Sequence, residues 1–265
     1  MNDESPANRP ADPAPRLEGD DGSGDQRIGA ALDFLRASAR RDGQSSWEAA
    51  SAWQEARLEE WAAGLGLLLN PAEFADRLVR GGQEHDVIPG PERYFKVTRS
   101  GVFGLSPGIE LELVPSGMDG RRFHLWEATP HQYLERLRLQ NLLTPGLNRL
   151  EGVLAQPDDL AICISQPRFD LIAVTQPEID DWFVAQGFRI VTSAAYYREE
   201  DNLGVFDAHD KNVVRSATNP DDLIPFDVIP VQPDGGFLQF IEDTLAAGQT
   251  LRAERITHTT SRVLS

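Results

Sequence analysis

Residues 207–212 read Asp-Ala-His-Asp-Lys-Asn, and Asp227 follows the next apolar run, Leu223-Ile224-Pro225-Phe226. An Asp and an Asn on one loop, with a second Asp after a hairpin, can serve phosphoryl transfer. In that chemistry Asp207 accepts the proton of an attacking hydroxyl, while Asn212 and Asp227 offer oxygen ligands that hold Mg²⁺ against nucleotide phosphates. The short pattern alone is common, so its meaning depends on what the upstream chain supplies.

The composition of the 265 residues is that of a globular protein. Hydrophobic residues make up 40% of the chain, enough for one sizeable core or for two lobes with a cleft between them. The net charge of −17 argues against nonspecific binding to nucleic acids or anionic membranes. We find no apolar run of membrane-spanning length and no signal-peptide pattern, so a cytoplasmic location is expected. Cys163 lies in an apolar run and is expected to be a buried, inert thiol.

The chain divides into four parts by composition and periodicity. Residues 1–26, rich in Pro, Asp and Gly, predict a disordered acidic tail, and residues 251–265 predict a second tail. Residues 27–69 predict a helical N-terminal extension in the form of a hairpin. Residues 70–250 alternate between strand and helix patterns, which favours the α+β class.

Two predicted helices have clear start signals. Thr129 and Gln132 cap one of them, and Thr175 and Glu178 form the capping box of the other. Upstream of these helices, residues 99–108 predict a loop and residues 109–114 predict a strand.

The second helix of the predicted hairpin carries three tryptophans. Ser45 and Glu48 form a capping box at its start, and Trp47, Trp53 and Trp61 lie along it. We expect these aromatic side chains to pack the hairpin onto the main domain. The alternative is a surface for a protein partner.

Two residues upstream of the loop can extend the phosphoryl-transfer pattern. Lys96 lies within a predicted strand after a glycine-containing turn, where it can reach nucleotide phosphates as a point charge; the alternative is a solvated side chain on an edge strand. Glu135 is the only acid of a helix predicted over 130–143 and can pair with Lys96; the alternative is a surface ion pair with a neighbouring arginine. All of these residues in this order along the chain are less probable by chance than any single one of them.

Together these motifs resemble the kinase-like domain found in polyvalent proteins of phages and mobile elements. More distantly they are similar to aminoglycoside and choline phosphotransferases, whose loop also reads Asp-x-His-x-x-Asn. The resemblance covers roughly residues 70–235 and implies a protein-kinase-like two-lobed fold with a reduced C-terminal lobe. The segments that carry it are Gly81-Gly82-Gln83-Glu84-His85, Tyr94-Phe95-Lys96-Val97-Thr98, Tyr133-Leu134-Glu135-Arg136-Leu137, Phe206-Asp207-Ala208-His209 with Asn212, and Pro225-Phe226-Asp227-Val228-Ile229.

The resemblance also implies a role for each matching residue. Lys96, with Gly81 and Gly82, would bind the phosphates of ATP, and Glu135 would orient Lys96. Asp207 would be the catalytic base, and Asn212 and Asp227 the Mg²⁺ ligands. The segment Ser165-Gln166-Pro167 would be a hinge that binds adenine through its backbone. The acceptor would be a hydroxyl group on a protein or on a small molecule.

The chain departs from the kinase pattern at three places. Phe206 stands where an Arg precedes the catalytic Asp, Val228-Ile229 replace the Phe-Gly that follows the metal-binding Asp, and Gly81-Gly82 make a short glycine loop. Two functions therefore remain open. One is a Mg²⁺- and ATP-dependent phosphotransferase, which the presence of all five charged and amide residues favours. The other is a non-catalytic, pseudokinase-like module that binds a nucleotide or a partner.

Overall fold

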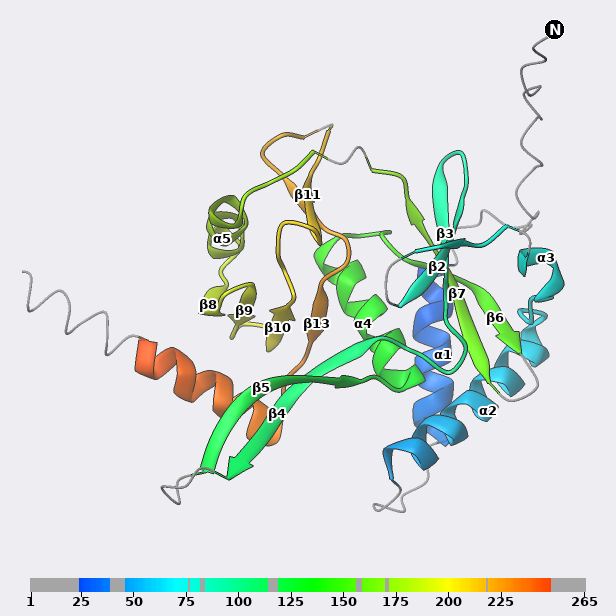
Figure 1. Cartoon of the computed structure of the whole chain (residues 1–265), viewed down its shortest axis with the longest axis horizontal. Coiled ribbons are helices and arrows are strands. Elements are labelled where there is room, and N and C mark those ends of the chain that lie inside the picture. Colours follow the sequence, from blue (N-terminus) through cyan, green and yellow to red (C-terminus); the bar gives the residue numbers. More distant parts are fainter. Residues whose placement is uncertain are drawn as a thin grey trace, which may run out of the picture.

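The protein is described by a computed structural model, shown in Figure 1. Its helices and several small sheets are compatible with the predicted α+β class. None of the described helices is long and apolar enough to cross a membrane. The described residues are 24–38, 46–75, 77–81, 84–113, 119–155, 159–169, 172–217 and 219–248. The two predicted tails therefore lie almost wholly outside them.

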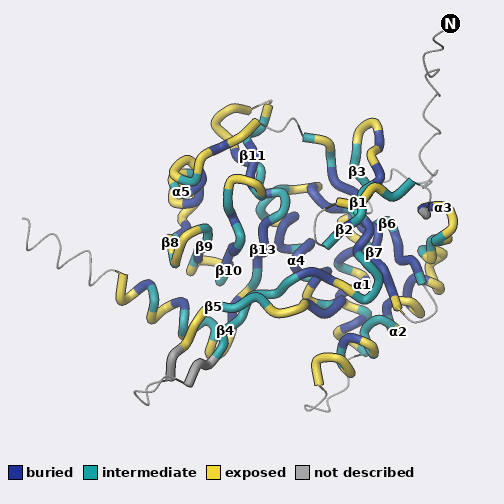
Figure 2. The backbone as a smooth tube through the Cα atoms, viewed as in Figure 1, coloured by how far each residue is buried: buried dark blue, intermediate teal, exposed yellow. Residues whose placement is uncertain are grey.

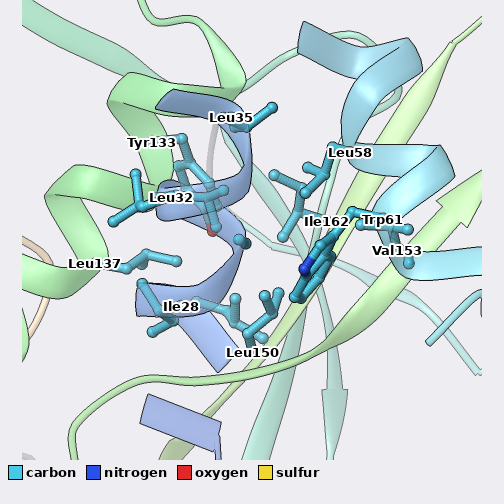
Figure 3. Close-up of a cluster of buried hydrophobic side chains, with 14 of the residues drawn as sticks. Ile28, Leu32, Leu35, Leu58, Trp61, Tyr133, Leu137, Leu150, Val153 and Ile162 are labelled. Carbon is cyan, nitrogen blue, oxygen red and sulfur yellow. The ribbon is translucent and has the colours of Figure 1, made fainter. Parts of the chain in front are cut away.

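Three helices open the described chain: α1 (Gly24–Ser38), α2 (Trp47–Leu65) and the short α3 (Ala72–Ala75). The cap of α2 is Ser46, whose hydroxyl accepts a hydrogen bond from the Ala49 amide, one residue after the predicted Ser45. Trp61 is buried in one core cluster with residues of α1, α4 and the large sheet (Figure 3). Trp47, in contrast, remains 38% exposed. The hairpin thus packs onto the main domain, as expected.

The first sheet has five antiparallel strands in the order β1-β2-β3-β7-β6. Helix α4 (Pro130–Leu143) begins with the predicted capping box of Thr129 and Gln132, and it packs beside α1. The strand β7 is buried along nearly its whole length, which matches its unbroken apolar sequence. The strand bounds are β1 (Val79–Arg80), β2 (His85–Pro89), β3 (Arg93–Thr98), β6 (Arg149–Ala155) and β7 (Leu160–Pro167).

A long hairpin is inserted between β3 and α4. Its strands are β4 (Leu105–Leu113) and β5 (Asp119–Glu127), and it extends away from the five-stranded sheet (Figure 1). The strand predicted over 109–114 lies largely within β4, whereas the loop predicted over 99–108 was wrong from Leu105 on and β5 was not predicted. Alternation in β5 explains the hairpin, because Phe123 and Leu125 pack on the second half of the chain while Trp126, on the other face, is exposed.

The second half of the chain forms a four-stranded sheet, β13-β10-β9-β8, and a two-stranded ribbon, β11-β12. Helix α5 (Gln176–Ala185) has the predicted capping box of Thr175 and Glu178, and a last helix spans 235–248. Buried segments lie in the middle of the molecule and exposed ones around its rim (Figure 2). The strand bounds are β8 (Arg189–Thr192), β9 (Ala195–Arg198), β10 (Leu203–Phe206), β11 (Val213–Arg215), β12 (Leu223–Pro225) and β13 (Ile229–Val231).

Candidate active site

A cleft of about 760 Å³ lies between β2 and β3 on one side and the loops that follow β10 and β12 on the other. Four of the residues singled out from the sequence lie on its wall, although they are far apart along the chain: Lys96, Asp207, Asn212 and Asp227. The remaining lining residues are Glu84, His85, Val87, Val102, Gly104, Leu105, Glu127, His209, Lys211 and Ile229.

Asp207 begins the loop after the buried strand β10 in a conformation that few residues other than glycine adopt. Its φ is 57°, and the Asn212 side chain stabilises it by donating through Nδ2 to the Asp207 backbone oxygen and to Oδ2, both at 2.8 Å. Burial raises the pKa of the Asp207 carboxyl above its usual value, although His209 and Asn212 oppose this shift. A carboxyl held in this way is suited to accept a proton.

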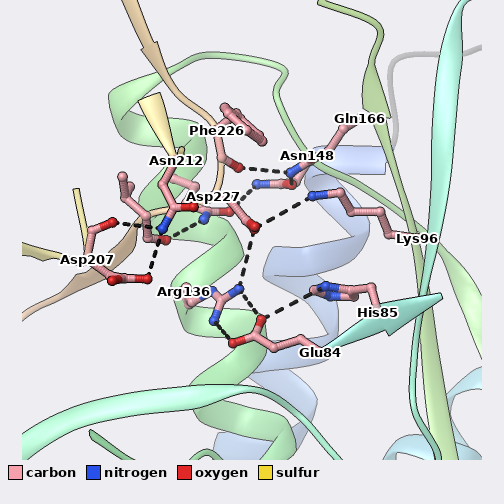
Figure 4. A network of polar contacts seen from close by, with 12 residues as sticks. Glu84, His85, Lys96, Arg136, Asn148, Gln166, Asp207, Asn212, Phe226 and Asp227 are labelled. Carbon is pink, nitrogen blue, oxygen red and sulfur yellow. Dashed lines mark hydrogen bonds and ion pairs between the residues drawn. The ribbon is translucent and has the colours of Figure 1, made fainter. Parts of the chain in front are cut away.

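Asp227 lies beside the same loop because the two segments share backbone hydrogen bonds. The amides of Phe226 and Asp227 both donate to the Asn212 backbone oxygen, at 3.0 and 3.3 Å. Since the Asn212 side-chain nitrogen is committed to Asp207, its Oδ1 remains as an acceptor on the same loop (Figure 4). Asn212 and Asp227 therefore bring two possible metal ligands to one end of the cleft. The Asn212 ligand is a neutral amide oxygen, and the Asp227 ligand is an anionic carboxylate oxygen.

Lys96 reaches across the cleft from the middle of β3. Its Nζ lies 3.6 Å from Asp227 Oδ1 and 5.7 Å from the centre of the Phe226 ring (Figure 4). Burial opposes ionisation of Asp227, but Lys96 and Arg136 outweigh it and hold the pKa of this carboxyl below its usual range. The carboxylate is thus charged at neutral pH and is partnered by a cation from the opposite wall.

The predicted ion pair between Lys96 and Glu135 is not present among the described residues. Glu135 instead accepts hydrogen bonds from Arg138, at 3.1 and 2.6 Å, and from Arg36 of α1, at 3.0 Å. Neighbouring residues on an α-helix point about 100° apart, so Glu135 and Arg136 face different sides of α4. The side that faces the cleft presents Arg136, and the interpretation of Glu135 as the partner of Lys96 was wrong.

Arg136 and Glu84 form the buried ion pair that sequence reasoning missed. Arg136 Nη1 and Nη2 donate to the two Glu84 oxygens at 3.1 and 2.6 Å, and Nη2 lies 4.0 Å from Asp227 Oδ1. Burial opposes the charge on Glu84, but Arg136 keeps its pKa below the usual value. The signal was available in the sequence, because Arg136 falls on one helical face with Tyr133 and Gln140, both almost fully buried.

His85 is neutral in this cluster. Burial, together with the nearby charges of Lys96 and Arg136, lowers its pKa to about 4. Its Nε2 lies 2.8 Å from the Tyr133 hydroxyl, and its Nδ1 lies 3.9 Å from Glu84. A neutral imidazole can share one hydrogen with the phenol, so the pair links β2 to α4 without adding a charge.

Apart from Lys96, none of the described residues that were predicted to contact phosphates or adenine lines the cleft. Gly81 follows β1, and a Cβ there would come within 2.5 Å of the His85 backbone oxygen, which explains the glycine; Gly82 lies outside the described residues. Ser165 and Gln166 are buried, and neither lines the cleft. The Ser165 backbone oxygen accepts a hydrogen bond from Arg93 at 2.8 Å. Binding of adenine by this segment therefore stays a prediction.

The oxygen atoms of Asn212 and Asp227 can hold a hard cation only if a bound substrate supplies further oxygen ligands. Within the described ranges, no three His, Cys, Asp or Glu side chains are grouped closely enough to hold a metal ion by themselves. Mg²⁺ commonly binds through one or two carboxylates plus substrate phosphates and water. Asn212 and Asp227 fit that arrangement, with Lys96 beside them for the phosphates.

A family model described as a serine/threonine/tyrosine kinase found in polyvalent proteins matches residues 124–224. This match confirms the resemblance to the kinase-like domain of polyvalent proteins; similarity to aminoglycoside and choline phosphotransferases is not shown. The matched segment contains Arg136, Asp207 and Asn212, whereas Lys96 and Asp227 lie outside it. The chain has no significant match among curated proteins or solved structures.

Proposed function

We propose that the chain is a kinase-like phosphotransferase that moves the γ-phosphate of ATP to a hydroxyl acceptor with the help of Mg²⁺. The family match supports the kinase class. The observation that carries the proposal is the convergence of Lys96, Asp207, Asn212 and Asp227 on one cleft. These side chains supply a cation for phosphates, a base and two oxygen ligands, which are the parts that phosphoryl transfer requires.

Each residue would act by position and charge. Asp207 would accept the proton of the attacking hydroxyl, and its raised pKa makes the carboxylate a stronger base for that role. Asn212 and Asp227 would hold the cation, which when bound neutralises the phosphate charge. Lys96, 3.6 Å from Asp227, would contact the phosphates directly.

One observation favours the alternative, a non-catalytic module that binds a nucleotide. Lys96 Nζ lies 3.6 Å from Oδ1 of Asp227, the proposed metal ligand, rather than beside a helix carboxylate, and Arg136 Nη2 lies 4.0 Å from the same oxygen. A Lys that stays on Asp227 would compete with the metal for the carboxylate. The two functions share nucleotide binding and differ in turnover.

Two isosteric variants separate chemistry from binding. Asp207→Asn removes the base and is expected to lower transfer from γ-labelled ATP by about 10²-fold or more, with little change in ATP affinity. Asp227→Asn places a neutral amide at the metal and is expected to weaken Mg²⁺-dependent ATP binding, as measured by calorimetry. Asp221→Asn, on an exposed turn away from the cleft, is the control.

Three results would change the assignment. Wild-type protein whose affinity for ATP is absent or indifferent to Mg²⁺ would remove the phosphotransfer proposal. Turnover that survives Asp207→Asn would show that Asp207 is not the base. Wild-type protein that binds ATP with Mg²⁺ but transfers no phosphate to itself, to water or to a tested acceptor would favour the non-catalytic module. Melting curves of each variant exclude loss of fold.

A further inference from the structure

Three buried amide side chains form a hydrogen-bonded chain behind Asp227. Gln140 comes from α4, Asn148 from the segment between α4 and β6, and Gln166 from the end of β7; at most 4% of each residue is exposed. Gln166 Nε2 donates to Asn148 Oδ1 at 2.7 Å, and Asn148 Nδ2 donates to Gln140 Oε1 at 2.8 Å. Each amide nitrogen therefore donates to the oxygen of the next amide, in the order Gln166, Asn148, Gln140. Rotating any one of the amides by 180° would place two donors or two acceptors against each other.

The two ends of this chain contact the backbone on either side of Asp227. Gln140 Nε2 donates to the Val228 oxygen at 2.6 Å, and Gln166 Nε2 also donates to the Phe226 oxygen at 3.3 Å (Figure 4). The Phe226 and Asp227 amides donate to Asn212 on the opposite side. The segment that carries Asp227 is thus held through its carbonyls by the amide chain and through its N–H groups by the Asn212 loop.

The amide chain is itself anchored to rigid elements. The Asn141 side chain donates to the Asn148 backbone oxygen at 2.9 Å and accepts from the Asn148 amide at 2.7 Å. Asn141 also donates to Asp25 of α1 at 2.7 Å. Burying so many amide groups is costly unless every donor and acceptor is paired, and here the donors are paired.

We infer that Gln140, Asn148 and Gln166 are positioning residues that hold Asp227 in the geometry a cation requires. This inference rests on the proposed function, because the cation and the nucleotide phosphates belong to it. A metal ligand must be placed to within a fraction of an ångström, and Asp227 lies in a short segment between β12 and β13 that has little structure of its own. Gln166, whose backbone the resemblance assigned to adenine, would act on the metal ligand through its side chain.

The test is a comparison of ATP affinity with Mg²⁺ and with EDTA. Gln166→Met keeps the length and neutrality of the side chain but removes its donors to Asn148 and Phe226. We expect the affinity for ATP with Mg²⁺ to fall about tenfold, a typical loss when a group that orients a metal ligand is removed, while the affinity in EDTA changes less than about twofold. Gln186→Met makes the same change at an exposed residue after α5 and should alter neither value.

Other outcomes overturn the inference. Equal losses of affinity with and without Mg²⁺ would mean that the network only supports the fold, and unchanged affinity would mean that it does not position Asp227. If Gln166→Met does not fold, Gln140→Met, which removes the donor to Val228, decides by the same two measurements. If neither variant folds, the network is structural and the inference is abandoned. Failure of the proposed function is distinguishable, because it appears in the wild-type protein as ATP binding that is absent or indifferent to Mg²⁺.

Discussion

Arg136 holds an unusual position for a charged residue, because only 5% of its surface is exposed while it pairs with Glu84 and approaches Asp227. Its Nε is buried and has no hydrogen-bond partner among the described residues. A buried guanidinium is tolerated when a carboxylate pairs with it through two hydrogen bonds, as Glu84 does. The cost of removing one partner is then the cost of leaving the other charge unpaired.

We therefore expect Arg136→Met to lower the free energy of unfolding by about 3 kcal/mol or more, measured by urea denaturation. Adding Glu84→Leu should recover part of that loss, because the stranded carboxylate is removed as well. The control is Arg138→Met, which breaks the more exposed pair with Glu135 and should cost less than about 1 kcal/mol. Additive losses in the double variant would show that Arg136 and Glu84 do not act as a pair.

His85 gives the protein a pH dependence that can be assigned to one residue. Its pKa is about 4 in the folded protein and near 6.5 when unfolded, so between these values only the unfolded chain takes up the proton. The contribution of His85 to the free energy of unfolding is therefore fully present above about pH 6.5. It falls as the pH drops toward about 4, by a total on the order of 3 kcal/mol.

Urea denaturation at about pH 7 and about pH 4.5 checks this expectation. The loss of stability between the two pH values should be clearly smaller in His85→Gln, whose amide can still bond the Tyr133 hydroxyl. His124→Gln, at a partly exposed histidine of the inserted hairpin, should keep the wild-type loss. An equal loss in wild type and His85→Gln would show that other groups cause it.

The residues of the cleft show what the sequence could and could not predict about the site. Asp207 and Asp227 come just after short strands and Asn212 lies on the Asp207 loop, so their spacing indicated that they would meet, and they do line one cleft. Glu135 was chosen by its charge and its place in the helix, but the direction of a helical side chain is decided by packing. Glu84 pairs with Arg136 across 52 positions of the chain, and no local pattern predicts such a pair.

At the scale of elements, α4 is held from two sides. Its outer side packs on α1 through a shared core that includes Leu32 and Leu137 (Figure 3). Polar contacts between Arg36 and Glu135 and between Asp25 and Asn141 add to this packing. Its inner side presents Arg136 and Gln140 to the segments around Asp227. The N-terminal helices therefore support the site indirectly, because they fix α4, which carries Arg136 and Gln140.

Elements with clear end signals were predicted well. The capping boxes at Thr129 and Thr175 identified the starts of α4 and α5, because a cap is a local arrangement of a few neighbouring residues. The hairpin β4-β5 was missed in part, since its side chains Phe123 and Leu125 pack on residues that are distant in the chain. Its best signal was the alternation of Phe123 and Leu125 with more exposed residues.

At the scale of the whole molecule, three distant segments meet behind the Asp207 loop. The ring of Phe206 stacks on Phe123 of β5 at 5.0 Å and approaches Phe237 of the last helix at 5.5 Å. Phe206 stands where kinases have an Arg before the catalytic Asp. Here Phe206 is almost fully buried against the inserted hairpin and the last helix. The start of the Asp207 loop is therefore held by apolar packing rather than by a polar side chain.

Phe123→Ala should therefore affect both stability and the loop. We expect the free energy of unfolding to fall by about 2–3 kcal/mol, somewhat less than for a fully buried Phe, because a cavity opens beside Phe206. Transfer from ATP should fall more than ATP affinity does, since Asp207 follows Phe206 directly while Asp227 is held from the other side by the amide chain. Trp126→Ala, on the opposite face of the same hairpin and 48% exposed, should change stability by less than about 1 kcal/mol. Urea denaturation, calorimetry with ATP and Mg²⁺, and a transfer assay give the three values. Equal effects of the two substitutions, or full transfer in Phe123→Ala, would show that the hairpin does not anchor the Asp207 loop.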